Sequence, residues 1–321
     1  MTEVERKACV EAVYMADRVC YAYPLGFEPY GWQKAFLRDK ASWKLLLCAR
    51  QSGKSTVISL ATSHKAKYWP DSLSVVLAPN RDQSQDDMAK IRAFIRHDPE
   101  FPELVKNNGD ALVLDNGSRI QVVTATDTGA RGKSAPALVI FDEAALIRDD
   151  VLGAALPMVT HSAPGYEVVY LSTPHGQSGG FYKAAIEADT GGQIAWRKYK
   201  VISPWIPDDD GMHLHRDPRT PEELMDECVA QGWAGGWFSP QHEDQAKQEK
   251  ILRQIGTTLY LQEYRCEFVA ADDDVFDPAD VDSLMDASGF DAGEVTGGLL
   301  PDDDDDFMWH GDEDGQVDPF V

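Results

Sequence analysis

The stretch that decides the fold runs from Leu45 to Thr56 and reads LLLCARQSGKST. It begins with a short apolar run, which is typical of a buried strand. It leads into a segment from about Ser55 to Tyr68 that favours a helix. A Gly-Lys-Ser sequence between a strand and a helix is the setting of a phosphate-binding loop. Backbone N–H groups at the start of such a helix bind phosphate oxygens, and the helix dipole favours their negative charge.

The positions of this loop have separate expected roles. Gly53 lets the backbone approach the phosphates, Lys54 reaches the β- and γ-phosphates, and the Ser55 hydroxyl binds Mg²⁺. The usual loop starts with glycine, where this chain has Cys48. A surface turn would be the better interpretation of the tripeptide alone, but the flanking strand and helix favour phosphate binding. The loop residues expected to bind the nucleotide are Arg50, Gln51, Ser52, Gly53, Lys54, Ser55 and Thr56.

A second apolar run, from Leu138 to Phe141, ends in the adjacent carboxylates of Asp142 and Glu143. A carboxylate at the carboxyl end of a parallel strand, beside a phosphate-binding loop, can hold Mg²⁺ through water. The next carboxylate can polarise the attacking water as a general base. A solvated strand end would also accommodate an Asp-Glu pair. With the loop upstream, we expect Asp142 to bind the metal and Glu143 to act as the base.

Continuous apolar runs at residues 74–78, 137–141 and 168–171 alternate with segments that favour helices. Strands that are apolar throughout indicate a mostly parallel sheet covered by helices on both faces. Together with the loop, this pattern predicts an α/β fold of the P-loop NTPase class, similar to RecA and other ASCE proteins. The dipeptide Asn116-Gly117 between two apolar runs predicts a hairpin.

The second half of the chain is less regular. Residues 203–240 are rich in Pro, Gly, Asp and Trp, and a polar helix is expected from about Pro240 to Ile255. The divisions that we expect are a lead-in at 1–30, an ATPase core at 31–202, a small subdomain at 203–271 and an acidic tail at 272–321.

The net charge of −24 is concentrated in the expected tail. Residues 272–321 hold 18 Asp or Glu and no Lys or Arg, so residues 1–271 carry only −24 + 18 = −6. The tail, with its acidic run from Asp302 to Asp306, is expected to be flexible and disordered. No apolar run approaches the roughly 20 residues that a membrane span requires, so no membrane association is expected. The five scattered cysteines favour reduced thiols in the cytosol.

The order of these motifs resembles the ATPase part of tailed-phage terminase large subunits. Arg50 four residues before Lys54, without a leading glycine, is similar to the variant phosphate loop of that family. Phe141-Asp142-Glu143-Ala144 resembles its Walker B motif. The remaining similar segments are Trp32-Gln33 as the adenine-recognising motif, Ser172-Thr173-Pro174 as the coupling motif, and Gln262 to Phe268 as the segment closing the ATPase domain. The resemblance extends over about residues 28–276.

The resemblance implies an ATP- and Mg²⁺-dependent motor that drives double-stranded DNA into a procapsid through the portal. It implies a homo-oligomeric ring on the portal protein and a small terminase subunit as a further partner. The protein is then expected in the host cytoplasm and at the portal vertex, and not in the mature virion. An arginine from a neighbouring subunit can complete each site in this family. Arg131 is similar to that residue, although it could also be a solvated loop residue, and Arg50 is the candidate within the same subunit.

The chain departs from the family pattern after Phe276, where 45 residues follow. Large subunits of this family carry a metal-dependent nuclease with an RNase H-like fold. The acids Asp277, Asp280 and Asp282 stand in low-complexity sequence without the alternating strands that would hold two metals. A solvated tail is the better interpretation of these acids. We therefore expect an ATPase without nuclease activity, with DNA cleavage supplied by a separate polypeptide.

Two other functions share some of these motifs. A helicase-like DNA translocase has the same glutamine motif, phosphate loop and Asp-Glu pair, but it needs a second RecA-like lobe. Residues 203–321 have few strand patterns from which to build that lobe. A nucleotide-binding assembly protein without turnover would not need the second carboxylate, Glu143. ATPase assays with and without duplex DNA distinguish the three functions.

Overall fold

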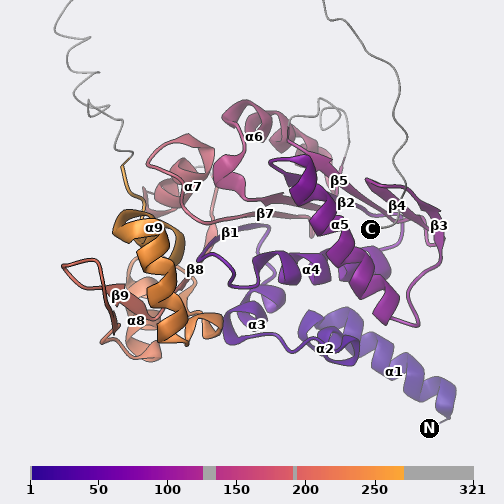
Figure 1. Cartoon of the computed structure of the whole chain (residues 1–321). Coiled ribbons are helices and arrows are strands. Elements are labelled where there is room, and N and C mark those ends of the chain that lie inside the picture. Colours follow the sequence, from indigo (N-terminus) through magenta and orange to yellow (C-terminus); the bar gives the residue numbers. More distant parts are fainter. Residues whose placement is uncertain (1, 126–134, 191–193, 271–321) are drawn as a thin grey trace, which may run out of the picture. The chain divides into compact units, whose positions relative to one another are not determined.

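A computed structural model describes residues 2–125, 135–190 and 194–270. Nine strands in these ranges form one sheet, shown in Figure 1. The strand order is β11 (Gly235–Phe238), β8 (Arg197–Ile202), β1 (Trp43–Cys48), β7 (Glu167–Ser172), β6 (Leu138–Asp142), β2 (Leu73–Ala78), β5 (Arg119–Thr124), β4 (Ala111–Leu114) and β3 (Leu104–Asn107). The strands from β11 to β5 pair in parallel, and β4 and β3 are antiparallel. The predicted mostly parallel α/β fold is confirmed.

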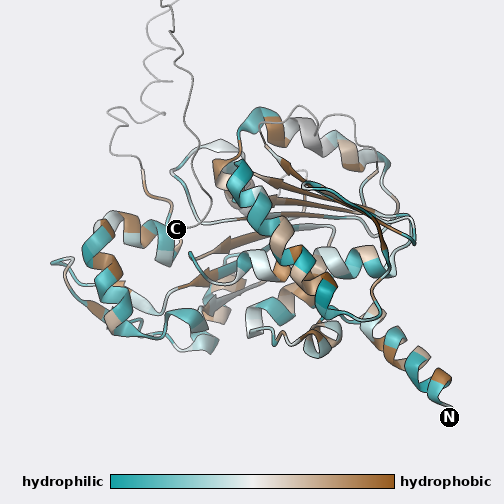
Figure 2. Ribbon diagram, turned by 45° about the vertical axis from the view of Figure 1, so that its right-hand side comes forward, coloured by the Kyte–Doolittle hydropathy of each residue, from teal (hydrophilic) through white to brown (hydrophobic). Residues whose placement is uncertain are grey.

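Helices cover both faces of the sheet, which explains the continuous apolar runs in the sequence. On β1, Leu46 and Cys48 pack into one core cluster, and Leu45 and Leu47 pack into the other. Figure 2 shows the hydrophobic strands enclosed between the helices. The first cluster contains α2 (Arg18–Ala22), α3 (Gly31–Arg38), α4 (Lys54–Tyr68) and α5 (Arg81–His97). The second contains α6 (Asp149–Ala155), α7 (Gly179–Thr190) and α8 (Pro221–Ala230).

The strand register brings the predicted motifs to one edge of the sheet. Strand β7 lies between β1 and β6, with Ser172 opposite Leu47 and Leu171 opposite Asp142. The parallel strands therefore direct the loop after β1, the carboxylates after β6 and the turn after β7 to the same carboxyl edge. Ligands of open α/β sheets bind at this edge.

The C-terminal part of the described chain adds a strand to the sheet and a small lobe beside it. β11 pairs with β8, and β9 (Trp205–Pro207) and β10 (Leu214–Arg216) form a separate hairpin. The helix expected from about Pro240 to Ile255 has other bounds. A 3₁₀ turn comes first, and α9 runs over Gln245–Arg265. Asp244 caps its start, and Gly256 permits a kink with φ of 78°.

The N-terminal helix α1 (Glu3–Ala16) extends from the rest of the fold in Figure 2. Its side chains reach the body through an ion pair from Lys7 to Glu100 and a hydrogen bond from Tyr68 to Glu11. No helix within the described ranges has the length and apolar character needed to span a lipid bilayer.

Candidate active site

The loop after β1 has the backbone shape of a phosphate cradle. Gln51 and Gly53 have φ values of 56° and 90°, and α4 begins at Lys54 directly after them. The φ of Gly53 strains any residue with a side chain, and a Cβ atom there would also lie 2.8 Å from Gln33 Nε2, so glycine is favoured at this position. The N-cap residue of α4 is Gly53, which has no side chain to cap the helix, and the first amides of a helix lack carbonyl partners within it. These amides can therefore donate to phosphate oxygens.

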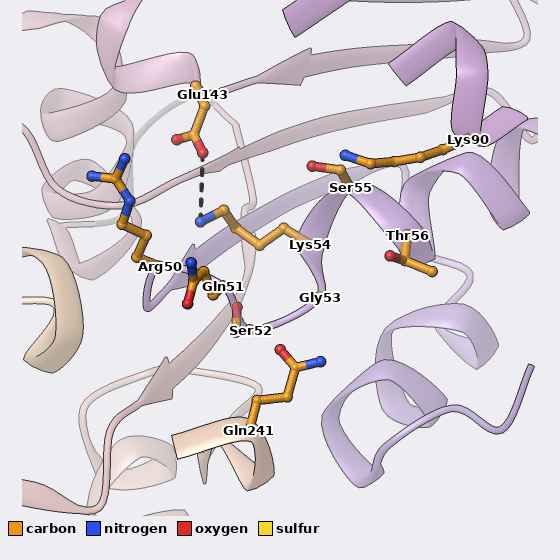
Figure 3. A pocket seen from close by; sticks show the side chains of 10 residues that line it. All are labelled: Arg50, Gln51, Ser52, Gly53, Lys54, Ser55, Thr56, Lys90, Glu143 and Gln241. Atoms are coloured by element: carbon orange, nitrogen blue, oxygen red, sulfur yellow. Dashed lines mark ion pairs between the residues drawn. The ribbon is translucent and has the colours of Figure 1, made fainter. Parts of the chain in front are cut away.

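Beside the loop lies a cavity of about 300 Å³, which Figure 3 shows with its lining side chains. The side chain of Lys54 is buried, and its Nζ lies 3.6 Å from Glu143 Oε1 and 3.3 Å from the Cys48 carbonyl oxygen. Burial is the largest single influence and lowers the pKa of Lys54, but Glu143, together with further acidic groups around it that include Asp142, outweighs burial and raises the pKa. Lys54 is therefore a buried cation at the place where phosphates would enter.

Ser55 and Asp142 form a pair suited to a divalent cation. The Ser55 hydroxyl lies 3.5 Å from Asp142 Oδ2, and the Asp142 side chain is fully buried at the end of β6. Burial, and after it the nearby Glu143 carboxylate, raises the pKa of Asp142 above its ordinary value. A bound cation would offset both effects. These oxygen donors fit Mg²⁺, which prefers hydroxyl, carboxylate and water ligands.

Glu143 stands in a left-handed conformation, with φ of 47° and ψ of 50°. A left-handed backbone is unfavourable for a residue with a side chain, and such strain often marks a functional position. The carboxylate is held on both oxygens, because Oε1 faces Lys54 and Oε2 accepts a 2.9 Å hydrogen bond from the Ser172 hydroxyl. The Glu143 carboxylate is therefore fixed at the rim of the cavity by contacts on both of its oxygens.

The predicted coupling motif contacts Glu143 directly. Ser172 ends β7, Thr173 is partly buried and Pro174 is buried beyond it. The hydrogen bond from Ser172 to Glu143 joins the end of β7 to the carboxylates after β6. A displacement of β7 would therefore move a hydrogen-bond partner of Glu143.

Arg50 points its side chain towards the C-terminal lobe. It is 63% exposed and pairs with Glu263 on α9 at 3.4 Å. Its backbone N–H also donates to the Glu263 carbonyl oxygen, and its own carbonyl oxygen accepts from His242. Arg50 is thus tied to Glu263 of α9 through its side chain and its backbone N–H, and to His242 of the preceding 3₁₀ turn through its carbonyl oxygen.

Gln33 is buried and supports the loop. Its Nε2 donates to the Gly53 carbonyl oxygen at 3.2 Å, and its Oε1 accepts from the Tyr30 amide at 2.9 Å. Recognition of adenine by this side chain stays a prediction. Arg131, the arginine predicted to act from a neighbouring subunit, lies outside the described residues, as do Asp277, Asp280 and Asp282.

Four further residues at the site were not predicted from the sequence. Gln83 on α5 donates to Asp142 Oδ2 at 2.9 Å, and Asp87 is buried one turn further along the helix. Lys90, also on α5, and Gln241 line the cavity (Figure 3). The only sequence signal for the α5 group is its spacing, since residues 83, 87 and 90 share one helix face.

Comparisons with known proteins identify the family and the fold of this chain. The sequence model of the family described as terminase large subunit, T4likevirus-type, N-terminal, matches residues 45–281. Among solved structures, the large terminase ATPase domain of Thermus phage P74-26 superposes with a TM-score of 0.56 at 21% identity. That alignment covers 78% of this chain and 97% of the domain. The HK97 bacteriophage large terminase superposes with a TM-score of 0.57 at 17% identity, over 83% of this chain and 55% of that protein. At these identities the two structures establish the shared fold.

Proposed function

We propose that this chain, which belongs to the T4-like virus family of terminase large subunits, is the ATPase motor that packages viral DNA. One observation carries the assignment of the chemistry. Lys54 follows β1, whereas Asp142 and Glu143 stand together at the end of β6, and these two segments meet beside one cavity at the carboxyl edge of the sheet. This is the set of groups that ATP hydrolysis requires.

The proposed roles follow from the contacts. The amides at the start of α4 and the Lys54 ammonium bind the triphosphate, and Ser55 and Asp142 hold Mg²⁺. When bound there, Mg²⁺ would neutralise part of the negative charge on the phosphates. Glu143, fixed by Lys54 and Ser172, takes a proton from the attacking water while orienting it towards the γ-phosphate.

Two arginines are proposed to complete the site. Arg50 would leave Glu263 and contact the γ-phosphate, which would connect nucleotide binding to α9. Arg131 of a neighbouring subunit would neutralise the charge that develops on the transferred phosphoryl group. Mixtures of Arg131→Ala and Glu143→Gln subunits should then recover some turnover at shared interfaces. Complete absence of recovery, with turnover independent of protein concentration, would contradict the trans role.

The further partners of this motor are also proposals. They are duplex DNA, the portal protein, the small terminase subunit and a homo-oligomeric ring on the portal, in the host cytoplasm. We propose that a separate polypeptide cuts the DNA. The acidic sequence around Asp277, Asp280 and Asp282, which lacks alternating apolar runs, supports this proposal.

A steady-state ATPase assay with and without plasmid duplex tests the proposed function. We expect Mg²⁺-dependent turnover that duplex DNA or portal protein stimulates, and an uncut plasmid with Mg²⁺ or Mn²⁺. Nucleotide binding without turnover under all these conditions would favour an assembly protein. Unwinding of a duplex with a single-stranded tail would favour a helicase-like translocase, and cleavage of the plasmid would overturn the proposal of a separate nuclease.

A further inference from the structure

One face of α5 lines the metal side of the candidate active site. Gln83, Asp87 and Lys90 occupy positions i, i+4 and i+7, which place them in one row on a helix. Asp87 is fully buried, and Gln83 and Lys90 are partly buried. Gln85 and Asp86, on the other side of the same turn, are exposed. The row is therefore polar although it faces the protein interior and the cavity.

Gln83 connects this row to the carboxylate assigned to Mg²⁺. Its Nε2 carries two hydrogens, and it donates to Asp142 Oδ2 at 2.9 Å and to Asp87 Oδ1 at 3.3 Å. The other oxygen of Asp142 accepts from the Glu143 amide at 3.1 Å. The Asp142 carboxylate is thus held from α5 on one side and from its own turn on the other, so its rotation is restricted.

Lys90 brings a positive charge to the same cavity. Figure 3 shows its side chain extending from α5 with the ammonium group directed towards Ser55. Lys90 also lies near Asp87, and its charge opposes the rise in the pKa of that carboxyl. A lysine that shares a cavity with a phosphate-binding loop, and whose ammonium group is directed towards Ser55 of that loop, is suited to an anionic phosphate ligand.

We propose that α5 forms a third wall of the nucleotide site, in which Lys90 binds the phosphates and Gln83 is a positioning residue for Asp142. This inference rests on the proposed ATPase function and adds two residues to its site. The side chains of this row come from α5 and not from the loop after β1. Their contribution to nucleotide binding can therefore be measured separately from that of Lys54. Gln83 acts only through Asp142, and its effect should therefore depend on the metal.

The test measures dissociation constants of a fluorescent ADP analogue, once in Mg²⁺ and once in EDTA. Lys90→Ala should weaken binding about tenfold in both conditions, because a charge-assisted contact is lost. Gln83→Ala and the similarly shaped Gln83→Met should leave binding in EDTA unchanged. In Mg²⁺ both should weaken binding about fivefold, and they should raise the Mg²⁺ concentration for half-maximal turnover by a similar factor.

The matched control is Gln85→Ala, which removes an exposed glutamine from the same helix and should leave both constants unchanged. Gln83→Met keeps the packing volume, so it separates loss of the hydrogen bond from loss of folding. Equal weakening by the Gln83 variants in Mg²⁺ and EDTA, or no weakening, would overturn the positioning role. Unchanged affinity in Lys90→Ala would overturn the phosphate contact. Failure of the wild-type protein to bind nucleotide would count against the proposed function itself, which is a distinct outcome.

Discussion

A cluster of charged side chains lies at each end of strands β1 and β7, and the two clusters differ in whether the charges have partners within the chain. At the amino ends, Lys44 of β1 pairs with Glu167 of β7 at 2.6 Å. At the carboxyl ends, the loop after β1 and Ser172 of β7 face a cavity. The same two strands therefore connect a closed ion-pair cluster to an open site.

The cluster at the amino ends, formed by Arg18, Lys44, Lys65 and Glu167, is complete within the chain. Glu167 accepts from Arg18 at 2.8 Å, from Lys44 at 2.6 Å and from Lys65 at 3.4 Å. All four side chains are buried. Although burial opposes it, the guanidinium of Arg18, followed by the two lysines, holds the pKa of Glu167 well below its usual range.

The group at the carboxyl ends is not complete in this way. Lys54 and Glu143 stand 3.6 Å apart, and the buried carboxyls of Asp87 and Asp142 face each other, so burial and this proximity raise the pKa of Asp87. Buried polar atoms in native proteins are normally paired, and the exceptions mark strained or functional positions. The difference between the two clusters indicates that one edge contributes stability and the other binds a ligand. If substitutions at the amino edge changed ligand binding, or substitutions at the carboxyl edge changed only stability, this distinction between the two clusters would be wrong.

The largest effect should come from Glu143→Gln. The amide keeps the size of the side chain but cannot accept the proton of water, so turnover should fall by about 10²–10⁴-fold. Nucleotide affinity should persist, because Lys54, Ser55 and Asp142 are unchanged. Single-turnover hydrolysis and a binding titration measure the two quantities. Turnover near the wild-type rate would show that Glu143 is not the base.

The next effect concerns stability, in Glu167→Gln. Removing the one carboxylate leaves the buried Arg18 and Lys44 unpaired, which should cost about 3–5 kcal/mol of unfolding free energy in urea. Because the pKa of Glu167 is lowered from 4.5, its contribution is present at neutral pH and is lost as pH falls below that value. The difference in unfolding free energy between Glu167→Gln and the wild-type protein should therefore become smaller in acid. Asp150→Asn, in the exposed Arg148–Asp150 pair, is the control and should cause no measurable change.

The smallest effect should come from Ser172→Ala. The variant loses the hydrogen bond to Glu143 Oε2, and turnover should fall about tenfold with little change in unfolding free energy. Ser74→Ala is a matched control, because Ser74 is a buried strand serine whose hydroxyl has no partner among the described residues. Equal loss of turnover in both variants would mean that the strand, and not the contact with Glu143, matters.

The sequence predicts those parts of the site whose signals are local. The loop around Lys54 and the carboxylates after β6 each combine a motif with a flanking strand, and a parallel sheet brings such strand ends together. The fold class followed from the same apolar runs. The roles predicted for the site residues stay predictions until the variants are measured.

The parts that depend on distant contacts could not be predicted. The sequence of α5 is that of a charged surface helix, and only its packing shows that Gln83 reaches Asp142. Arg18, Lys44 and Glu167 are far apart in the chain, and no spacing rule connects them. The short β11 begins with Gly235-Gly236, which has little strand propensity and pairs because β8 offers it a free edge.

The most direct test of the difference between the two clusters is the gain in unfolding free energy on addition of Mg²⁺ and ADP. At a ligand concentration about 100 times the dissociation constant, the wild-type protein should gain about 2.7 kcal/mol. Glu167→Gln should gain the same amount from its lower starting value, because its site is intact. At that same ligand concentration, Lys54→Ala should gain almost nothing. No gain in the wild-type protein, or an equal gain in Lys54→Ala, would contradict the account.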